Sequence, residues 1–113
     1  MTYEEWLKDI GARIMARRQQ LRMTQEEVAE KGDLTPQFVS YAETGKRAMR
    51  PENLLKLAEA LGVSTDYLLT GKITDADLLI LSEKMKKLSP SQLRSVENVI
   101  DECLILYGKS GEE

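Results

Sequence analysis

The side chains best suited to specific chemistry lie in one short stretch, LTPQFVSYAETGKR, which covers residues 34–47. Gln37, Ser40 and Tyr41 are spaced three and four residues apart, so a helix here presents an amide and two hydroxyl groups on one face. These groups form directional hydrogen bonds. The stretch then ends in a Lys-Arg pair. This order of residues indicates a helix that recognises a partner by hydrogen bonds, followed by a loop that contacts phosphate groups.

Several kinds of catalytic site are excluded by what the sequence lacks. The 113 residues contain no histidine and a single cysteine, Cys103, which argues against a structural zinc site and rules out a histidine acid or base. The seven glycines are scattered and form no phosphate-binding loop. The sequence also shows no cluster that combines a nucleophile with a base. We therefore expect no enzyme activity, no metal and no cofactor.

The compartment is indicated by the same counts. A lone cysteine allows no internal disulfide, which is typical of a reducing cytoplasm. The N-terminus, MTYEEWLKD, has neither the basic start nor the apolar core of a secretion signal. No apolar run approaches the roughly 20 residues that a membrane span needs. We expect a cytoplasmic protein that does not enter a membrane.

Charge is distributed unevenly along the chain. Residues 1–72 carry 11 basic and 11 acidic side chains, whereas residues 73–113 carry 5 and 8, so the net charge of −3 belongs to the C-terminal part. Four arginines are concentrated near the start, at positions Arg13, Arg17, Arg18 and Arg22. A local basic face of this kind can bind a polyanion even when the surrounding region is neutral.

Capping residues divide the first part of the chain into five short helices. Thr24 and Glu27 form a capping box, Thr35-Pro36 is an N-cap followed by a proline at the first helical position, and Ser64 caps a short segment. Glycines stand where several of these helices should end. The expected helices cover residues 3–22, 25–31, 36–44, 51–61 and 65–69. The chain is therefore predicted to be all-α, with five helices packed in residues 1–72.

Residues 73–113 are predicted to form a helical hairpin, with helices from 75 to 88 and from 90 to 107. Apolar residues recur at alternating spacings of three and four in both helices. The apolar face of the second helix is too wide to be covered by one partner helix. The hairpin could fold back on the first five helices, but we favour pairing with a second copy of the chain. The residues expected in that interface are Leu78, Leu81, Met85, Leu93, Val96, Ile100, Cys103, Leu104 and Tyr107.

From Ile10 to Gly71 the chain resembles the Cro-like, phage-repressor-type family of helix-turn-helix transcriptional regulators. The matching pieces are Arg18 followed by MTQEEVAEK, then LTPQFVSYAETGKR, then PENLLKLAEALGVSTDYLL. The sequence departs from the family in the turn, where Asp33 occupies the usual glycine position and Gly32 replaces an apolar residue. The resemblance implies a five-helix, repressor-like DNA-binding domain in residues 1–72.

The resemblance also assigns contacts with double-stranded DNA. It makes Gln37 a main base-reading residue, and a glutamine amide can bond to two edge atoms of adenine. Pro36 has no group that reads a base edge. The remaining expected contacts, to bases or to phosphates, come from Thr24, Gln25, Thr35, Phe38, Ser40, Tyr41, Lys46, Arg47 and Arg50. Capping alone would explain the two threonines, and Phe38 is equally suited to the core.

By the same resemblance, Arg18 pairs with Glu43. A planar guanidinium suits a bidentate, partly buried contact with a carboxylate. Glu43 is then a structural residue, although it lies beside the face expected to meet DNA.

The sequence as a whole predicts a transcriptional regulator, expected to be a repressor, that binds a palindromic operator as a homodimer. An alternative is an antitoxin-type regulator whose C-terminal hairpin binds a different protein. A protein that copurifies with the chain would distinguish the two.

Overall fold

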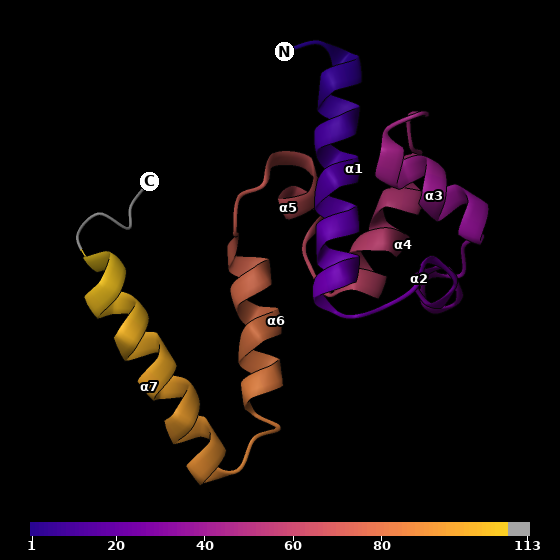
Figure 1. The fold of residues 1–113 in the computed structure, drawn as a ribbon. Coiled ribbons are helices and arrows are strands. Elements are labelled where there is room, and N and C mark those ends of the chain that lie inside the picture. Colours follow the sequence, from indigo (N-terminus) through magenta and orange to yellow (C-terminus); the bar gives the residue numbers. More distant parts are fainter. Residues whose placement is uncertain (109–113) are drawn as a thin grey trace. The chain divides into compact units, whose positions relative to one another are not determined.

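The computed structural model describes residues 1–108, and every regular element in this part of the chain is an α-helix (Figure 1). The predicted all-α class is confirmed. Residues Met1–Ile80 form one compact unit, and a second unit begins at Leu81. The helices are α1 (Tyr3–Gln20), α2 (Gln25–Gly32), α3 (Pro36–Thr44), α4 (Pro51–Leu61), α5 (Thr65–Thr70), α6 (Asp75–Met85) and α7 (Pro90–Tyr107).

The helix starts follow the capping residues seen in the sequence. The hydroxyl of Thr24 accepts the N–H of Glu27 at 3.1 Å, and the Glu27 carboxylate accepts the N–H of Thr24 at 2.8 Å. Ser89 and Gln92 form the same reciprocal pair at the start of α7, at 3.2 and 2.9 Å. Both capping boxes satisfy backbone donors that no helical carbonyl can reach.

Two helices end earlier than expected. α1 stops at Gln20 because Arg22 adopts a left-handed backbone, with φ of 58°. α6 stops at Met85 rather than at Leu88, whose N–H bonds to the carbonyl three residues back in a tighter turn. Ser89, just before Pro90, is then extended, as the residue before a proline usually is.

The core of the first unit forms around α1, which packs against α3, α4 and α5 (Figure 1). α2 packs against α3 and α4. α1 buries an apolar stripe formed by Leu7, Ile10 and Ile14. The side chains buried from the other helices are Val28, Ala29, Val39, Ala42, Leu57, Ala58, Ala60, Leu61 and Leu68. A single cluster therefore holds the five N-terminal helices together.

Asp77 joins the first turn of α6 to the start of α5. Its carboxylate accepts the backbone N–H and the hydroxyl of Ser64, both at 2.7 Å. It also accepts the N–H and the hydroxyl of Thr74, at 3.0 and 3.2 Å. The beginning of α6 thus belongs to the first unit, and the structural division after Ile80 falls later than the expected division at residue 72.

Candidate nucleic-acid interface

α3 presents one polar side to solvent and one apolar side to the core. Val39 and Ala42 are buried, whereas Gln37 is exposed and Ser40 and Tyr41 are half-buried on the other side. This division follows from the helical spacing of the residues. The structure thereby brings the three expected hydrogen-bonding side chains together on one surface.

The turn before α3 lacks the glycine that the family usually has there. Asp33 takes the left-handed backbone that the family usually gives to glycine, with φ of 56°. Gly32 is buried, and a Cβ built on it would lie 3.1 Å from the side chain of Leu34 and 3.3 Å from the carbonyl of Lys56. An aspartate can adopt left-handed backbone, so the turn keeps its direction without the usual glycine.

Gln37, Tyr41 and Arg47 form a cluster that spans α3 and the loop after it. The Gln37 amide nitrogen donates to the Tyr41 hydroxyl at 2.9 Å. The guanidinium of Arg47 lies 4.6 Å from the centre of the Tyr41 ring, within cation–π distance. These residues line a groove of about 300 Å³, which the apolar side chains of Phe38 and Met49 also line.

The two other α3 candidates have structural roles at their positions. The Thr35 hydroxyl accepts the N–H of Phe38 at 3.1 Å and so caps the helix. Phe38 is half-buried and packs against the core, while the rest of its surface lines the groove.

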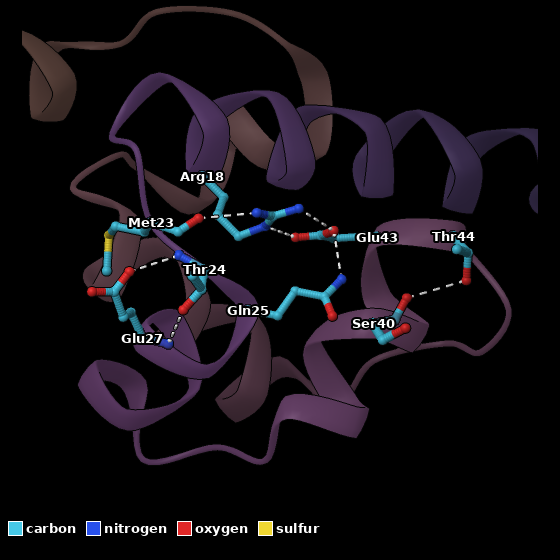
Figure 2. A network of polar contacts seen from close by, with 8 residues as sticks. All are labelled: Arg18, Met23, Thr24, Gln25, Glu27, Ser40, Glu43 and Thr44. Carbon is cyan, nitrogen blue, oxygen red and sulfur yellow. Dashed lines mark hydrogen bonds and ion pairs between the residues drawn. The ribbon is translucent and has the colours of Figure 1, made fainter.

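At the start of α2, Gln25 points toward α3. Its amide nitrogen donates to the Glu43 carboxylate at 3.0 Å (Figure 2). Thr24 is engaged in its capping box, which Figure 2 also shows. The sequence did not predict the link from Gln25 to Glu43, because residues 18 positions apart give no local signal of contact.

Arg18 and Glu43 form the ion pair that the resemblance implied. The guanidinium contacts both carboxylate oxygens, at 2.5 and 3.1 Å, and a third N–H bonds to the carbonyl of Met23 at 2.9 Å (Figure 2). The side chains are 13% and 2% exposed. The hydrogen bond that Arg18 donates to Glu43 raises the pKa of Arg18 and outweighs the opposing effect of burial. The pair therefore holds α1 against the end of α3.

The loop after α3 carries exposed cations. Lys46 and Arg47 are exposed and lie beside Tyr41, with the Lys46 ammonium 6.0 Å from the ring centre. Arg50 is exposed and only loosely paired with Glu52, at 3.9 Å. The loop is thus placed next to the polar face of α3, as expected of residues that contact phosphates.

The arginines of α1 do not form the basic face suggested by their spacing. Arg13 donates to the carbonyl of Leu68 and Arg17 donates to the carbonyl of Leu61, both at 2.8 Å. These carbonyls lie in the last turns of α5 and α4, where cations are favoured. Together with Arg18, they bond to groups within the first unit and so help to hold its helices together.

Two glycines, Gly11 and Gly45, allow α1 and α3 to touch. A Cβ on Gly11 would lie 2.8 Å from the carbonyl carbon of Glu43, and one on Gly45 would lie 2.8 Å from the backbone of Lys8. Real Cβ contacts are not this short. The one available signal was Gly11 itself, because a glycine inside a helix is unfavourable unless close packing requires it.

The C-terminal helices leave much apolar surface uncovered. No residue described in α6 or α7 is buried. Among the expected interface residues, exposure ranges from 42% at Leu93 to 65% at Leu104, apart from Met85 and Val96, which are partly buried, and Cys103, which is exposed. Within the second unit, Met85 faces Leu93 across a groove that Val96 and Ile100 also line.

Helices α2 and α3 form a helix-turn-helix unit. A short turn joins them, and α1, α4 and α5 support them. The chain matches the family model described as Helix-turn-helix over residues 14–68. It is 32% identical over 103 residues to the HTH-type transcriptional regulator ImmR of Bacillus subtilis strain 168, which covers 91% of this chain and 77% of that protein. The chain belongs to the Cro-like, phage-repressor-type helix-turn-helix transcriptional regulators.

Two solved structures share the fold of the first unit. One is the P22 c2 repressor protein in complex with synthetic operator 9T, with a TM-score of 0.54, 36% identity, and coverage of 56% of this chain and 96% of that one. The other is the clp gene regulator ClgR from C. glutamicum, with a TM-score of 0.53, 28% identity, and coverage of 57% and 83%.

These relatives are named as regulators or repressors and not as enzymes. Within residues 1–108, no helix is both long and apolar enough to cross a membrane. In the same residues, no three acidic, histidine or cysteine side chains gather where they would hold a metal ion.

Proposed function

We propose that the chain is a cytoplasmic, sequence-specific regulator that binds double-stranded DNA and acts as a repressor. The observation that carries this proposal is the polar face of α3, which stands beside an exposed basic loop on a fold shared with an operator-bound repressor. In this proposal α3 enters the major groove, which admits an α-helix and distinguishes all four base pairs.

Each candidate residue has a distinct part in this proposal. Gln37 reads an adenine edge through its amide, with Ser40 and Tyr41 beside it on the same face. Lys46, Arg47 and Arg50 contact phosphates, as do residues at the start of α2, where the free N–H groups of a helix favour an anion. Arg18 and Glu43 keep the two helices in register without touching DNA.

The second unit supplies the dimer in this proposal. An isolated helix-turn-helix unit contacts few base pairs, whereas two linked units bind two half-sites with a higher effective affinity. The uncovered apolar side chains of α6 and α7 are suited to pairing with a second copy, since exposed patches of this kind mark interaction sites. The excess negative charge of residues 73–113 would then lie away from DNA.

Selection from random-sequence DNA tests the proposed function. The purified chain is incubated with randomised duplexes, and the retained molecules are sequenced. We expect two inverted half-sites whose centres are about 10 base pairs apart, or a multiple of that, because two-fold symmetric proteins bind pseudo-palindromes. A retained pool without any enriched sequence would contradict the proposal.

Purification of the tagged chain from its host, followed by sedimentation, tests the second unit. A homodimer supports the proposed pairing. A stoichiometric second protein that is lost when α7 is altered would instead favour the antitoxin-type alternative, in which α6 and α7 bind a different chain.

A further inference from the structure

Tyr41 lies between the proposed base reader and the proposed phosphate loop. Gln37 is one helical turn before it and donates its amide N–H to the Tyr41 hydroxyl at 2.9 Å. Arg47 comes from the loop, and its guanidinium lies over the Tyr41 ring at 4.6 Å. One half-buried side chain therefore contacts both groups at once, each through a different part of its structure.

The hydroxyl of Tyr41 fixes how Gln37 presents its amide. A glutamine side chain offers two N–H donors and one carbonyl oxygen. One N–H is held by Tyr41, which leaves the second N–H and the carbonyl oxygen for a contact with another molecule. A donor and an acceptor side by side are what the N7 and N6 groups of adenine require.

The ring of Tyr41 fixes Arg47 in a similar way. An exposed arginine has many rotamers, and ordering it on binding costs free energy. Stacking on an aromatic face selects a small set of these rotamers before any ligand arrives. The Tyr41 ring and Arg47 line one groove between α3 and the loop, together with Phe38 and Met49.

We propose that Tyr41 is a positioning residue that couples base reading by Gln37 to phosphate contact by Arg47. This inference rests on the proposed DNA-binding function and adds to it. Gln37, Tyr41 and Arg47 then act as one connected unit and not as three independent contacts. The effects of substituting them on DNA binding are therefore not additive.

The test uses Tyr41→Phe, which removes only the hydroxyl, and Tyr41→Leu, which also removes the ring. Each is made in the full chain alone and together with Gln37→Ala or Arg47→Ala, and binding is measured on the selected site and on scrambled DNA. We expect Tyr41→Phe to lower the preference for the selected site about threefold to tenfold, the effect of one hydrogen bond, with an unchanged salt dependence. In the Gln37→Ala background this effect should vanish.

Tyr41→Leu should further weaken binding to all DNA, by about twofold to fivefold, the effect of a cation–π contact. That loss should vanish in the Arg47→Ala background. Tyr41→Phe keeps the aromatic ring. Its double-mutant cycle with Gln37→Ala therefore tests the coupling even if the Tyr41→Leu chain does not fold.

A measurement without DNA separates this inference from the proposed function. In NMR spectra of the free chain, the Tyr41 ring should shift the side-chain proton signals of Arg47 upfield, and Tyr41→Leu should remove the shift. Two results would overturn the role of Tyr41 but not the proposed function. One is the absence of the shift, and the other is additive losses of DNA binding in chains that still bind DNA selectively. Absence of any sequence preference in the unaltered chain would overturn the proposed function.

Discussion

At the residue scale, the carboxylate of Glu43 is the most constrained group beside the proposed DNA face. It is 2% exposed and accepts bonds from Arg18 and Gln25. A buried carboxylate is tolerated only when it is paired and hydrogen-bonded, and here α1 and α2 supply its partners. Its negative charge is thereby neutralised close to where phosphates are expected.

Removing one partner of this pair should destabilise the fold. We expect Arg18→Ala to lower the free energy of unfolding by about 3–5 kcal/mol, because the Glu43 carboxylate is left buried without a counter-charge. The exposed pair of Arg94 and Glu97, joined at 2.7 Å, provides the matched control. Arg94→Ala should cost less than about 1 kcal/mol. Urea unfolding of the three chains checks both values, and equal small losses would show that burial of the first pair does not matter.

Residues differ in how far the sequence revealed them. The pairing of Arg18 with Glu43 was predicted from the family resemblance and is confirmed. The bonds from Arg13 and Arg17 to helix carbonyls could not be foreseen, because an arginine on a helix surface looks the same in sequence whether it faces solvent or a neighbouring helix end. Gln25 shares this difficulty, since its partner Glu43 is distant in the sequence.

At the element scale, the close approach of α1 and α3 depends on Gly11. In an exposed helical position, replacing glycine by alanine stabilises a protein by about 1 kcal/mol. Here we expect the opposite sign, with Gly11→Ala lowering the free energy of unfolding by about 1–3 kcal/mol, because the new methyl would meet backbone carbonyls of α3.

The exposed residue Ala16 on the same helix supplies the control for this prediction. Ala16→Gly should cost about 1 kcal/mol from helix propensity alone. Thermal and urea unfolding of both variants measure the signs. A Gly11→Ala chain more stable than the original would show that α1 and α3 are not in close contact there.

The joint between α5 and α6 gives a dependence of stability on pH. Partial burial by itself raises the pKa of Asp77, but the hydrogen bonds from Thr74 and Ser64 outweigh it and hold the pKa below the ordinary value of 3.8. A carboxylate with a lowered folded-state pKa stabilises the fold above its unfolded pKa, and this contribution is lost as the pH falls through the folded value.

We therefore expect Asp77→Asn to reduce the free energy of unfolding by an amount that stays constant between about pH 5 and 7. The difference from the original chain should shrink as the pH falls below 3.8. Asp75 is an exposed carboxylate on the same turn, and Asp75→Asn therefore controls for the loss of one negative charge. Unfolding curves measured at a series of pH values check this. A difference that does not change with pH would mean that the charge of Asp77 plays no part.

Helix starts were more predictable than helix ends. Capping boxes at Thr24 and Ser89 use residues within one turn of each other, so the sequence contains the whole signal. The early end of α6 at Met85 depends on a turn that tightens before Pro90, and the apolar spacing up to Leu88 concealed it. Periodicity marks which residues share a face but not where the hydrogen bonds of a helix cease.

At the scale of the whole molecule, the proposed dimer interface in the second unit rests more on the sequence pattern than on the fold of one chain. The expected interface residues were chosen from apolar spacing, and all of them except Met85 and Val96 are exposed within one chain. Their pairing with a second copy stays a prediction. Oligomeric state depends on surfaces of two molecules, and a single sequence shows only one of them.

A charge placed on α7 should separate the proposed dimer. We expect Ile100→Glu in the full chain to shift the protein to monomer, since a carboxylate buried between two apolar faces is costly. Ser95→Glu, on the same helix and also exposed, should leave the dimer intact. Analytical ultracentrifugation measures both. A monomeric unaltered chain would contradict the proposed dimer. If both variants remain dimers, the interface lies elsewhere.

The central claim, that the exposed face of α3 reads bases, is tested most directly by the binding of Gln37→Ala to the selected DNA site and to scrambled DNA. We expect this variant to lose about 1–3 kcal/mol on the selected site and to bind scrambled DNA as before. Arg50→Ala provides the contrast, with weaker binding to both and a salt slope lowered by about one unit. Equal losses of the Gln37→Ala chain on the two DNAs would contradict a base-reading role for α3.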